Sequence, residues 1–313
     1  MARLGDMLGK QGRFLIENDL YALVCIAVLT LIPFAAWLSA AIIALITLRK
    51  GWLDGFKGFA VAVLVLIAAS IPTTTILSAV VTALIAFLPC YLTAAVLHST
   101  ASWRMAGLFI VAQALLGLVL IHWLVPEFIS KQYQYFLTIL KEMALSSSDD
   151  SLNGLLNNKD ALSQIVNANY LMGIQAVCVV MTAIASLLLA RSVQARLYYP
   201  GGFRQEMLMF RASGFGVILL AFVAINAYLR SPLAISCLPM LVTYYLCAGL
   251  SLGFSILAKD KDKGIKMLIL LIVPLILLPY VVLPIYALCG ALDSFFNFRL
   301  RLATDAGGKE NKG

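Results

Sequence analysis

Long apolar segments, separated by short polar ones, recur along this 313-residue chain and constrain its fold more than any other feature. The chain is 62% hydrophobic and 12% charged, whereas a soluble domain carries about 25% charged residues. No stretch outside the apolar segments is suited to building a soluble core. We therefore expect an all-α integral membrane protein, a polytopic helix bundle of about 8–10 transmembrane segments, each needing about 20 mostly apolar residues.

Two of the apolar segments are too long for one plain helix and contain prolines. The first, residues 20–48, is interrupted by Pro33. The second, residues 267–298, is interrupted by Pro274, Pro279 and Pro284. Proline inside a membrane is tolerated where neighbours or a cavity re-satisfy the backbone. We therefore expect each segment to form a pair of short helices.

One long polar segment, residues 126–167, stands between the spans. Its apolar residues from Phe128 to Met143 repeat at helical spacing, which predicts an amphipathic helix at the membrane interface or over the bundle. Acids outnumber lysines there, so we expect it to be extracytoplasmic. Residues 1–302 then form a single membrane domain, and residues 303–313 form a disordered cytoplasmic tail.

The basic residues indicate the orientation of the chain. If both overlong segments are helix pairs, every basic loop falls on one side, and lysine and arginine collect in cytoplasmic loops. We therefore expect both termini to be cytoplasmic. This rule also explains most of the net charge of +8, so nucleic-acid binding is not expected and the lipid bilayer is the first partner.

Catalytic and metal-binding patterns are not found in the sequence. All six cysteines fall in apolar segments without a CxxC pair, as buried cysteines that act as small hydrophobes do. His98 and His122 lie at opposite ends of successive expected helices, too far apart to share a metal. No acid or base falls at mid-membrane depth, where proton relays place one. We therefore expect that the protein is not an enzyme and that it binds neither a metal nor a cofactor.

Several polar side chains fall within the expected spans. An unpaired polar group in hydrocarbon costs several kcal/mol, so each of them needs a partner. Two interpretations remain: hydrogen bonds between helices, or a shared polar pocket for a small molecule. The candidate ligand residues are Gln113, Gln175, Asn226, Tyr244 and Tyr245.

Residues 191–211 are the densest charged stretch, with four arginines and one glutamate around a Pro-Gly-Gly turn. Apolar segments precede and follow it, so we expect a cytoplasmic loop. Three interpretations remain: topology and lipid anchoring, a docking surface for a cytoplasmic partner, or phosphate binding by the glycines with Arg204. The candidate docking residues are Arg191, Arg196, Tyr199, Gly201, Gly202 and Arg204.

A stripe of small residues marks the second half of the first broken segment. Ala36, Ala40 and Ala44 recur at four-residue spacing. Small residues at this spacing let a second helix approach closely. We therefore expect a close helix–helix contact there.

Three stretches resemble the YybS-like family of predicted bacterial membrane proteins. They are residues 190–206, with their Tyr-Tyr-Pro-Gly-Gly-Phe-Arg run, residues 288–299, with a glycine–aspartate–aromatic–arginine pattern, and residues 37–51. The resemblance implies a distant likeness in fold to the substrate-binding components of energy-coupling-factor transporters. Those components dock on a partner through small residues of an early helix, which would be Ala36, Ala40 and Ala44 here. The extra helices and the long outer segment depart from the minimal component.

Two hypotheses for the function follow. The first is a component of the bacterial inner membrane that binds or transports a small solute. The second is a non-transporting scaffold or assembly factor that docks a cytoplasmic partner through residues 191–211.

Overall fold

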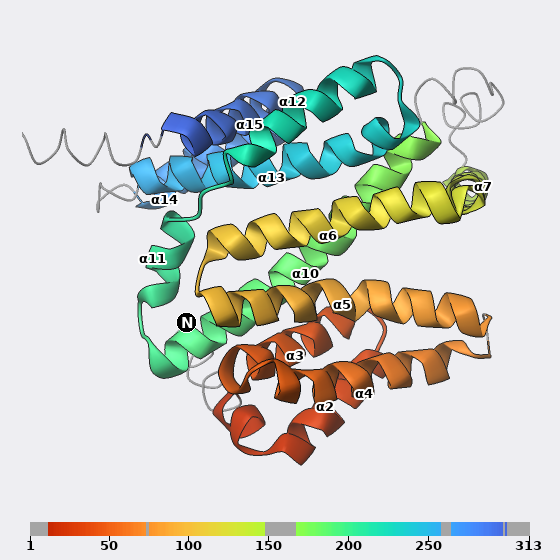
Figure 1. The fold of residues 1–313 in the computed structure, drawn as a ribbon, viewed down its shortest axis with the longest axis vertical. Helices are drawn as coiled ribbons and strands as arrows, with labels where there is room; N and C mark the ends of the chain where they lie inside the picture. Colours follow the sequence, from red (N-terminus) through yellow and green to blue (C-terminus); the bar gives the residue numbers. More distant parts are fainter. Residues whose placement is uncertain (1–11, 73–74, 148–166, 258–263, 297, 299–313) are drawn as a thin grey trace, which may run out of the picture. The chain divides into compact units, whose positions relative to one another are not determined.

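The structure is a computed structural model that describes residues 12–72, 75–147, 167–257, 264–296 and 298. Within these ranges every regular element is a helix (Figure 1). The labelled helices are α2 (Asp19–Leu31), α3 (Ala36–Lys50), α4 (Trp52–Ser70), α5 (Ile76–Thr100), α6 (Trp103–Leu124), α7 (Pro126–Ser147), α10 (Ala168–Tyr198), α11 (Gly202–Leu208), α12 (Phe215–Tyr228), α13 (Pro232–Leu257), α14 (Gly264–Leu277) and α15 (Pro279–Phe296).

Six of these helices are long and apolar enough to cross a membrane: α4, α5, α6, α10, α13 and α15. The shorter helices α2 and α12 are also apolar. The prediction of a helical, multi-pass architecture is therefore confirmed for the described part of the chain. The expected total of about 8–10 spanning segments stays a prediction. It is estimated from the length that one span needs.

The chain divides into two compact units. Unit 1 comprises residues 1–111, 179–214 and 244–313, and unit 2 comprises residues 112–178 and 215–243. Helices α6, α10 and α13 each contribute residues to both units. The prediction of a single membrane domain over residues 1–302 stays a prediction.

The first overlong segment forms two helices, as predicted. Helix α2 ends at Leu31 and α3 begins at Ala36. Pro33 lies in the turn between them, where Phe34 adopts a left-handed backbone with φ of 62°. A polar contact joins the two helices, because the hydroxyls of Thr30 and Ser39 lie 2.9 Å apart.

The last overlong segment also forms two helices, but only one of its three prolines separates them. Helix α14 ends at Leu277 and α15 begins at Pro279. Proline suits the first position of a helix, where its missing N–H would have no partner. Pro274 and Pro284 lie inside α14 and α15, so the prediction that they interrupt the segment is wrong.

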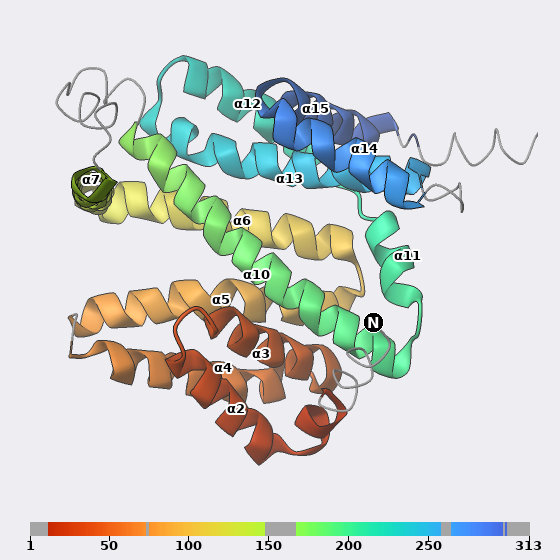
Figure 2. The same ribbon diagram turned by 180° about the vertical axis from the view of Figure 1, so that it is seen from behind.

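Helix α3 lies in the interior of unit 1, in contact with α2, α4 and α5 (Figures 1 and 2). Ala40 and Ala44 are 3% and 0% exposed. The thiol of Cys90 on α5 lies 3.6 Å from the carbonyl oxygen of Ala40. The small-residue stripe thus permits a close approach as expected, but the helix that approaches belongs to the same chain. Docking of another protein on this stripe stays a prediction, and in the structure Ala40 and Ala44 are covered by the chain itself, while Ala36 is half-buried.

The outer polar segment contains one long helix, α7. It begins at Pro126 and its amphipathic character agrees with the predicted one. Residues 148–166, which complete the predicted extracytoplasmic segment, lie outside the described residues, as does the predicted tail at residues 303–313.

Candidate functional site

The arginine-rich segment is mostly helical, so the prediction of a loop over residues 191–211 is wrong. Helix α10 continues to Tyr198 and carries Arg191 and Arg196. Helix α11 begins at Gly202. Only the corner between the two helices and the residues after α11 are irregular. Arginine and tyrosine are tolerated in helices, and the first strong helix breaker in the segment is the Pro-Gly pair after Tyr199.

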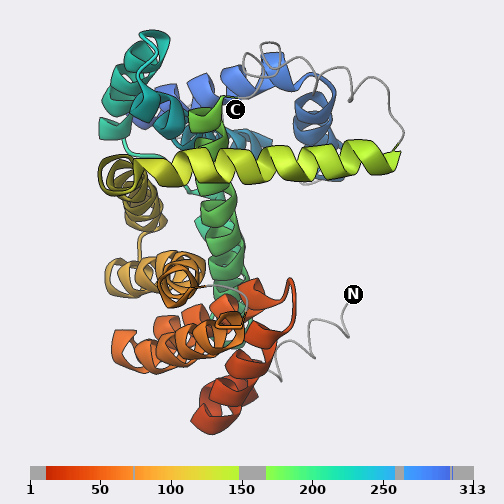
Figure 3. The ribbon, with the colours of Figure 1, turned by 90° about the vertical axis from the view of Figure 1, so that its right-hand side faces the viewer.

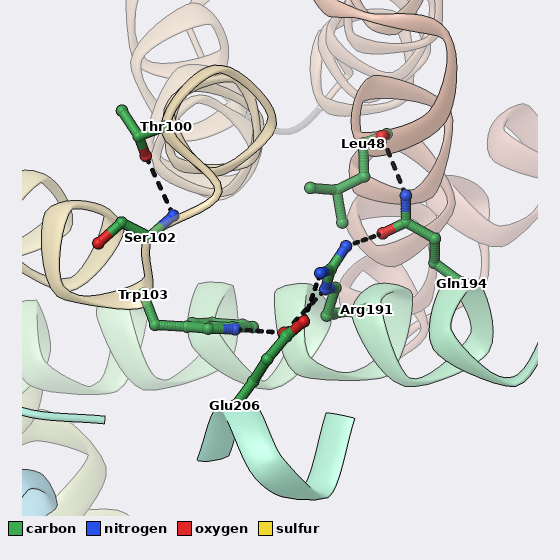
Figure 4. Close-up of polar contacts among 7 residues, drawn as sticks. All are labelled: Leu48, Thr100, Ser102, Trp103, Arg191, Gln194 and Glu206. Atoms are coloured by element: carbon green, nitrogen blue, oxygen red, sulfur yellow. Dashed lines mark hydrogen bonds and ion pairs between the residues drawn. The ribbon is translucent and has the colours of Figure 1, made fainter. Parts of the chain in front are cut away.

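An ion pair between Arg191 and Glu206 closes this corner (Figure 4). The Arg191 Nε donates to Oε2 of Glu206 at 2.9 Å, and its Nη2 donates to Oε1. The indole Nε1 of Trp103, at the start of α6, donates to the same Oε2 at 2.7 Å. A two-pronged contact from a planar guanidinium fixes orientation as well as distance. The corner therefore has a defined geometry.

The same network reaches the end of α3. The Nη1 of Arg191 donates to the side-chain oxygen of Gln194 at 2.7 Å, and Gln194 Nε2 donates to the carbonyl oxygen of Leu48 at 3.0 Å. The His98 Nδ1 lies 3.0 Å from that oxygen. The last carbonyls of a helix lack partners within the helix, so these side chains supply them for α3. Figure 4 also shows the turn between α5 and α6, where the Ser102 amide donates to the Thr100 hydroxyl.

The environment of Glu206 favours its charged form. Burial by itself raises the pKa of this carboxyl, but the hydrogen bonds from Arg191 and Trp103 and the charge of Arg191 lower it more. The net result is a pKa below the ordinary value. Glu206 is therefore an ionised anchor for Arg191 at neutral pH.

The residues after α11 are held against α13 and α15. Arg211 donates from Nε to the carbonyl oxygen of Asp293 at 2.9 Å and from Nη2 to that of Ser294 at 2.8 Å. Tyr245 donates its hydroxyl to the carbonyl oxygen of Ser213 at 2.7 Å, and the amide of Ser213 donates to the Tyr244 hydroxyl at 3.0 Å. Both tyrosines, proposed above as ligand residues, thus bind main-chain groups of their own unit.

The exposed side chains at the corner between α10 and α11 include Arg196, Tyr199 and Arg204. We call this surface the arginine corner. The turn passes through Gly201, whose φ of 88° favours glycine. Gly202 is buried beneath the Tyr199 ring, where a Cβ would lie 2.1 Å from Cδ1. The two glycines thus shape the corner, and the Gly202 amide donates to the Tyr199 carbonyl at 3.1 Å.

The other predicted ligand residues belong to unit 2. Gln113, Gln175 and Asn226 are half-buried, and Asn226 donates to the carbonyl oxygen of Phe222 in its own helix at 2.8 Å. Among the described residues, every buried side-chain nitrogen or oxygen has a hydrogen-bond partner. These contacts support the interpretation of structural hydrogen bonds more than that of a ligand pocket.

Sequence reasoning missed the roles of Trp103, Gln194 and Glu206. Trp103 and Glu206 are far apart in the sequence, and no local pattern pairs them. One signal was available, because Glu206 is the single acid among four arginines in residues 191–211. A lone acid in a basic segment is a candidate for an internal ion pair.

Metal ligands are not grouped in the part of the chain that the structure describes, where no set of three His, Cys, Asp or Glu residues could hold an ion. The six cysteines are free thiols. In unit 2, His122 Nδ1 lies 2.9 Å from the carbonyl oxygen of Leu118, and its Nε2 lies 3.4 Å from the hydroxyl of Ser236. That hydroxyl donates to the carbonyl oxygen of Asn169, so it is engaged by the main chain.

Comparisons with known proteins give no further guide, because no family model, no curated protein and no solved structure matches this chain.

Proposed function

We propose that this chain is a multi-pass protein of the bacterial inner membrane that docks an acidic cytoplasmic protein on its arginine corner. Six membrane-length helices support the membrane location. The bacterial inner membrane is what the resemblance to the YybS-like family implies, and membership in that family stays a prediction. Both termini are cytoplasmic in this proposal.

The distribution of charge supports a cytoplasmic position for the corner. Unit 1 carries exposed basic residues at the ends of several helices: Arg49, Lys57, Arg104, Arg196 and Arg204. The contacts of Leu48, His98, Gln194 and Glu206 bring the ends of α3, α5, α6, α10 and α11 together. Basic residues at helix ends are typical of the cytoplasmic side.

One observation carries the docking proposal: the four arginines of the segment have two different environments. Arg191 and Arg211 bind groups of the chain itself, whereas Arg196 and Arg204, which precede and follow Tyr199 in the sequence, are exposed. A topology signal needs only positive charge near the membrane and does not need a fixed geometry. Here Arg191 and Arg211 bind the chain itself and hold the segment in place. Arg196 and Arg204 are exposed, as is the aromatic side chain of Tyr199.

The composition of the corner fits protein recognition. Tyr199 is 68% exposed, and tyrosine and arginine are enriched among the residues that dominate binding energy at interfaces. Arg49 stacks on the ring of Tyr198 with its Cζ 4.1 Å from the centroid, which extends the basic surface. A partner that fits carries carboxylates, because the arginine fork matches them in geometry and charge.

Transport of a small solute stays a prediction. The hydroxyls of Tyr244 and Tyr245, two of its five candidate residues, bind the main chain at Ser213. We therefore place docking first. A small molecule that co-purifies with the protein would favour transport instead.

The proposal is tested with charge-matched variants purified from cells in mild detergent, followed by mass spectrometry of bound proteins and small molecules. R196K/R204K keeps the charge but removes both guanidinium forks, and R196A/R204A removes the charge as well. K131A/K141A, on α7, is the control that removes two charges elsewhere. We expect one acidic protein to be lost with R196A/R204A, reduced with R196K/R204K and retained in the control.

Orientation is measured in the same variants with reporter fusions at the C-terminus. The proposal requires that R196K/R204K inserts as the wild type does while it loses partner. If every effect of the variants on binding is explained by changed orientation or expression, the segment serves topology alone and the docking proposal is wrong.

A further inference from the structure

Helix α7 runs across the end of α6 instead of continuing it (Figures 1 and 3). The α6 helix ends at Leu124, and α7 begins at Pro126, which has no amide hydrogen to continue the α6 ladder. The amide of Phe128 donates to the carbonyl oxygen of Val125 at 2.9 Å and closes the turn. Both segments of this corner belong to unit 2. If α6 crosses the membrane, a helix that turns across its axis runs along the membrane surface.

The faces of α7 differ sharply in chemistry. At 100° per residue, its charged residues fall on one side of the helix: Glu127, Lys131, Lys141 and Glu142. The opposite side carries Ile129, Tyr133, Phe136, Leu137 and Leu140. Of these apolar residues Ile129 is buried and the others are half-buried.

A second apolar stripe on α7 is exposed. Tyr135, Ile139 and Met143, spaced four residues apart, are 65%, 37% and 59% exposed. The stripe lies between the charged side of the helix and its buried apolar side. An exposed apolar stripe of this length on a soluble surface is unfavourable, so it requires an occupant.

The exposed residues of the neighbouring helix α6 indicate what covers this stripe. Its apolar side chains Leu116, Leu120, Trp123 and Leu124 are exposed along the spanning helix. Exposed apolar residues on a spanning helix face lipid, and Trp123, 80% exposed at its end, is the residue type that collects at the membrane interface. Val125, 53% exposed, extends this run of exposed apolar residues to the start of α7.

We propose that α7 lies in the outer interface of the bilayer, with Tyr135, Ile139 and Met143 inserted at the boundary between headgroups and acyl chains. The charged side faces water, and its exposed Lys131 lies 3.7 Å from Glu127. Amphipathic helices with a strongly polar face bind membranes in this in-plane position. This position depends on α6 crossing the membrane and does not depend on the arginine corner.

The test places an environment-sensitive fluorescent amino acid at residue 139 or at residue 138 of the full-length protein. Amber suppression leaves the six native cysteines in place. Thr138 is the matched control, because it is the neighbouring residue and lies on the polar side. The protein is reconstituted into phosphatidylcholine–phosphatidylglycerol vesicles with or without lipids that carry a spin-label quencher near the headgroup.

We expect the quencher to reduce the fluorescence at residue 139 at least threefold more than that at residue 138. Equal quenching at both positions, or none at either, overturns the proposal, since the helix then has no membrane-facing side. If position 139 does not yield folded protein, residues 143 and 142 provide the same comparison. Protection of residue 139 without lipid quenching assigns the stripe to a protein contact and also overturns the proposal.

Discussion

The guanidinium of Arg211 lies at the C-terminal end of α15, where its Nε donates to the carbonyl oxygen of Asp293 at 2.9 Å. The carbonyls at the end of a helix lack intrahelical partners and carry partial negative charge. A cation from a distant part of the chain supplies that partner here. The last residue of the arginine segment thus joins two parts of unit 1.

Replacement of Arg211 therefore destabilises the fold. We expect R211A to lower the free energy of unfolding by about 2 kcal/mol, because a charged hydrogen-bond donor to main-chain oxygens is lost. The melting temperature of the purified protein in detergent measures this loss. R196A is the matched control, since Arg196 is exposed and a surface change is expected to alter stability by less than about 0.5 kcal/mol. Equal melting temperatures of R211A and the wild type would contradict the anchoring role.

The ion pair of Glu206 makes stability depend on pH. Its pKa lies below the ordinary value of 4.5 in the folded state, so the unfolded state binds more protons in acid. The stabilisation is complete above pH 4.5 and is lost as the pH falls through the lower folded-state pKa. We expect E206Q to melt below the wild type at pH 7, and the difference to shrink as the pH falls below 4.5.

Melting curves of both proteins across that range give the answer. R191K serves as a second variant, because it keeps the charge but loses the fork to both carboxylate oxygens. A difference between E206Q and the wild type that does not change with pH would show that the charge of Glu206 is not what stabilises the corner.

Helices α13 and α15 approach closely at two glycines. A Cβ on Gly249 would lie 2.0 Å from the carbonyl oxygen of Tyr286, and one on Gly290 would lie 2.1 Å from that of Tyr245. Because main-chain atoms cannot move aside cheaply, we expect G249A and G290A each to cost about 3 kcal/mol or more. Fluorescence-detected size exclusion of tagged protein measures the loss of folded material.

The control for both glycines is G117A. Gly117 lies within α6, and a Cβ added there would have no atom within 4 Å outside its own stretch of helix, so alanine adds helix propensity of about 1 kcal/mol without a clash. If G249A folds as well as G117A, the two helices are further apart than described.

A variant of Tyr245 distinguishes a structural role of the Tyr244–Tyr245 pair from a ligand-binding role. Y245F removes the hydrogen bond to the Ser213 carbonyl, and we expect a loss of about 1 kcal/mol. Native mass spectrometry of the wild type and Y245F, with their melting temperatures, tests this. A bound small molecule that is present in the wild type and absent from Y245F would contradict a purely structural role.

Sequence patterns predicted the helices better than the contacts between them. Pro33 and Pro279 mark the two breaks because proline removes a donor from the helical ladder. The same rule misplaced breaks at Pro274 and Pro284, since helices in apolar surroundings accommodate prolines when neighbouring groups satisfy the backbone.

The arginine segment shows why the site itself was only partly predictable. Its charges suggested a loop, yet nothing before the Pro-Gly pair stops α10. Arg191 binds Glu206, which also accepts from the distant Trp103, and Arg211 binds the distant Asp293, whereas Arg196 and Arg204 are exposed. Partners that are remote in sequence leave no local pattern. The stripe of Ala40 and Ala44 was also only partly informative. Its spacing predicts a closely packed helix, but not whether that helix belongs to the same chain or to a partner.

The most direct measurement of the docking proposal is photo-crosslinking in living cells from residue 199, replaced by a benzophenone amino acid. Tyr199 is 68% exposed at the arginine corner, and Tyr228, 87% exposed in unit 2, is the matched control position. The proposal predicts one discrete adduct with an acidic cytoplasmic protein from position 199, none from position 228, and loss of that adduct in R196A/R204A with orientation unchanged. Adducts with lipid alone, or a protein adduct that persists in R196A/R204A, would contradict it.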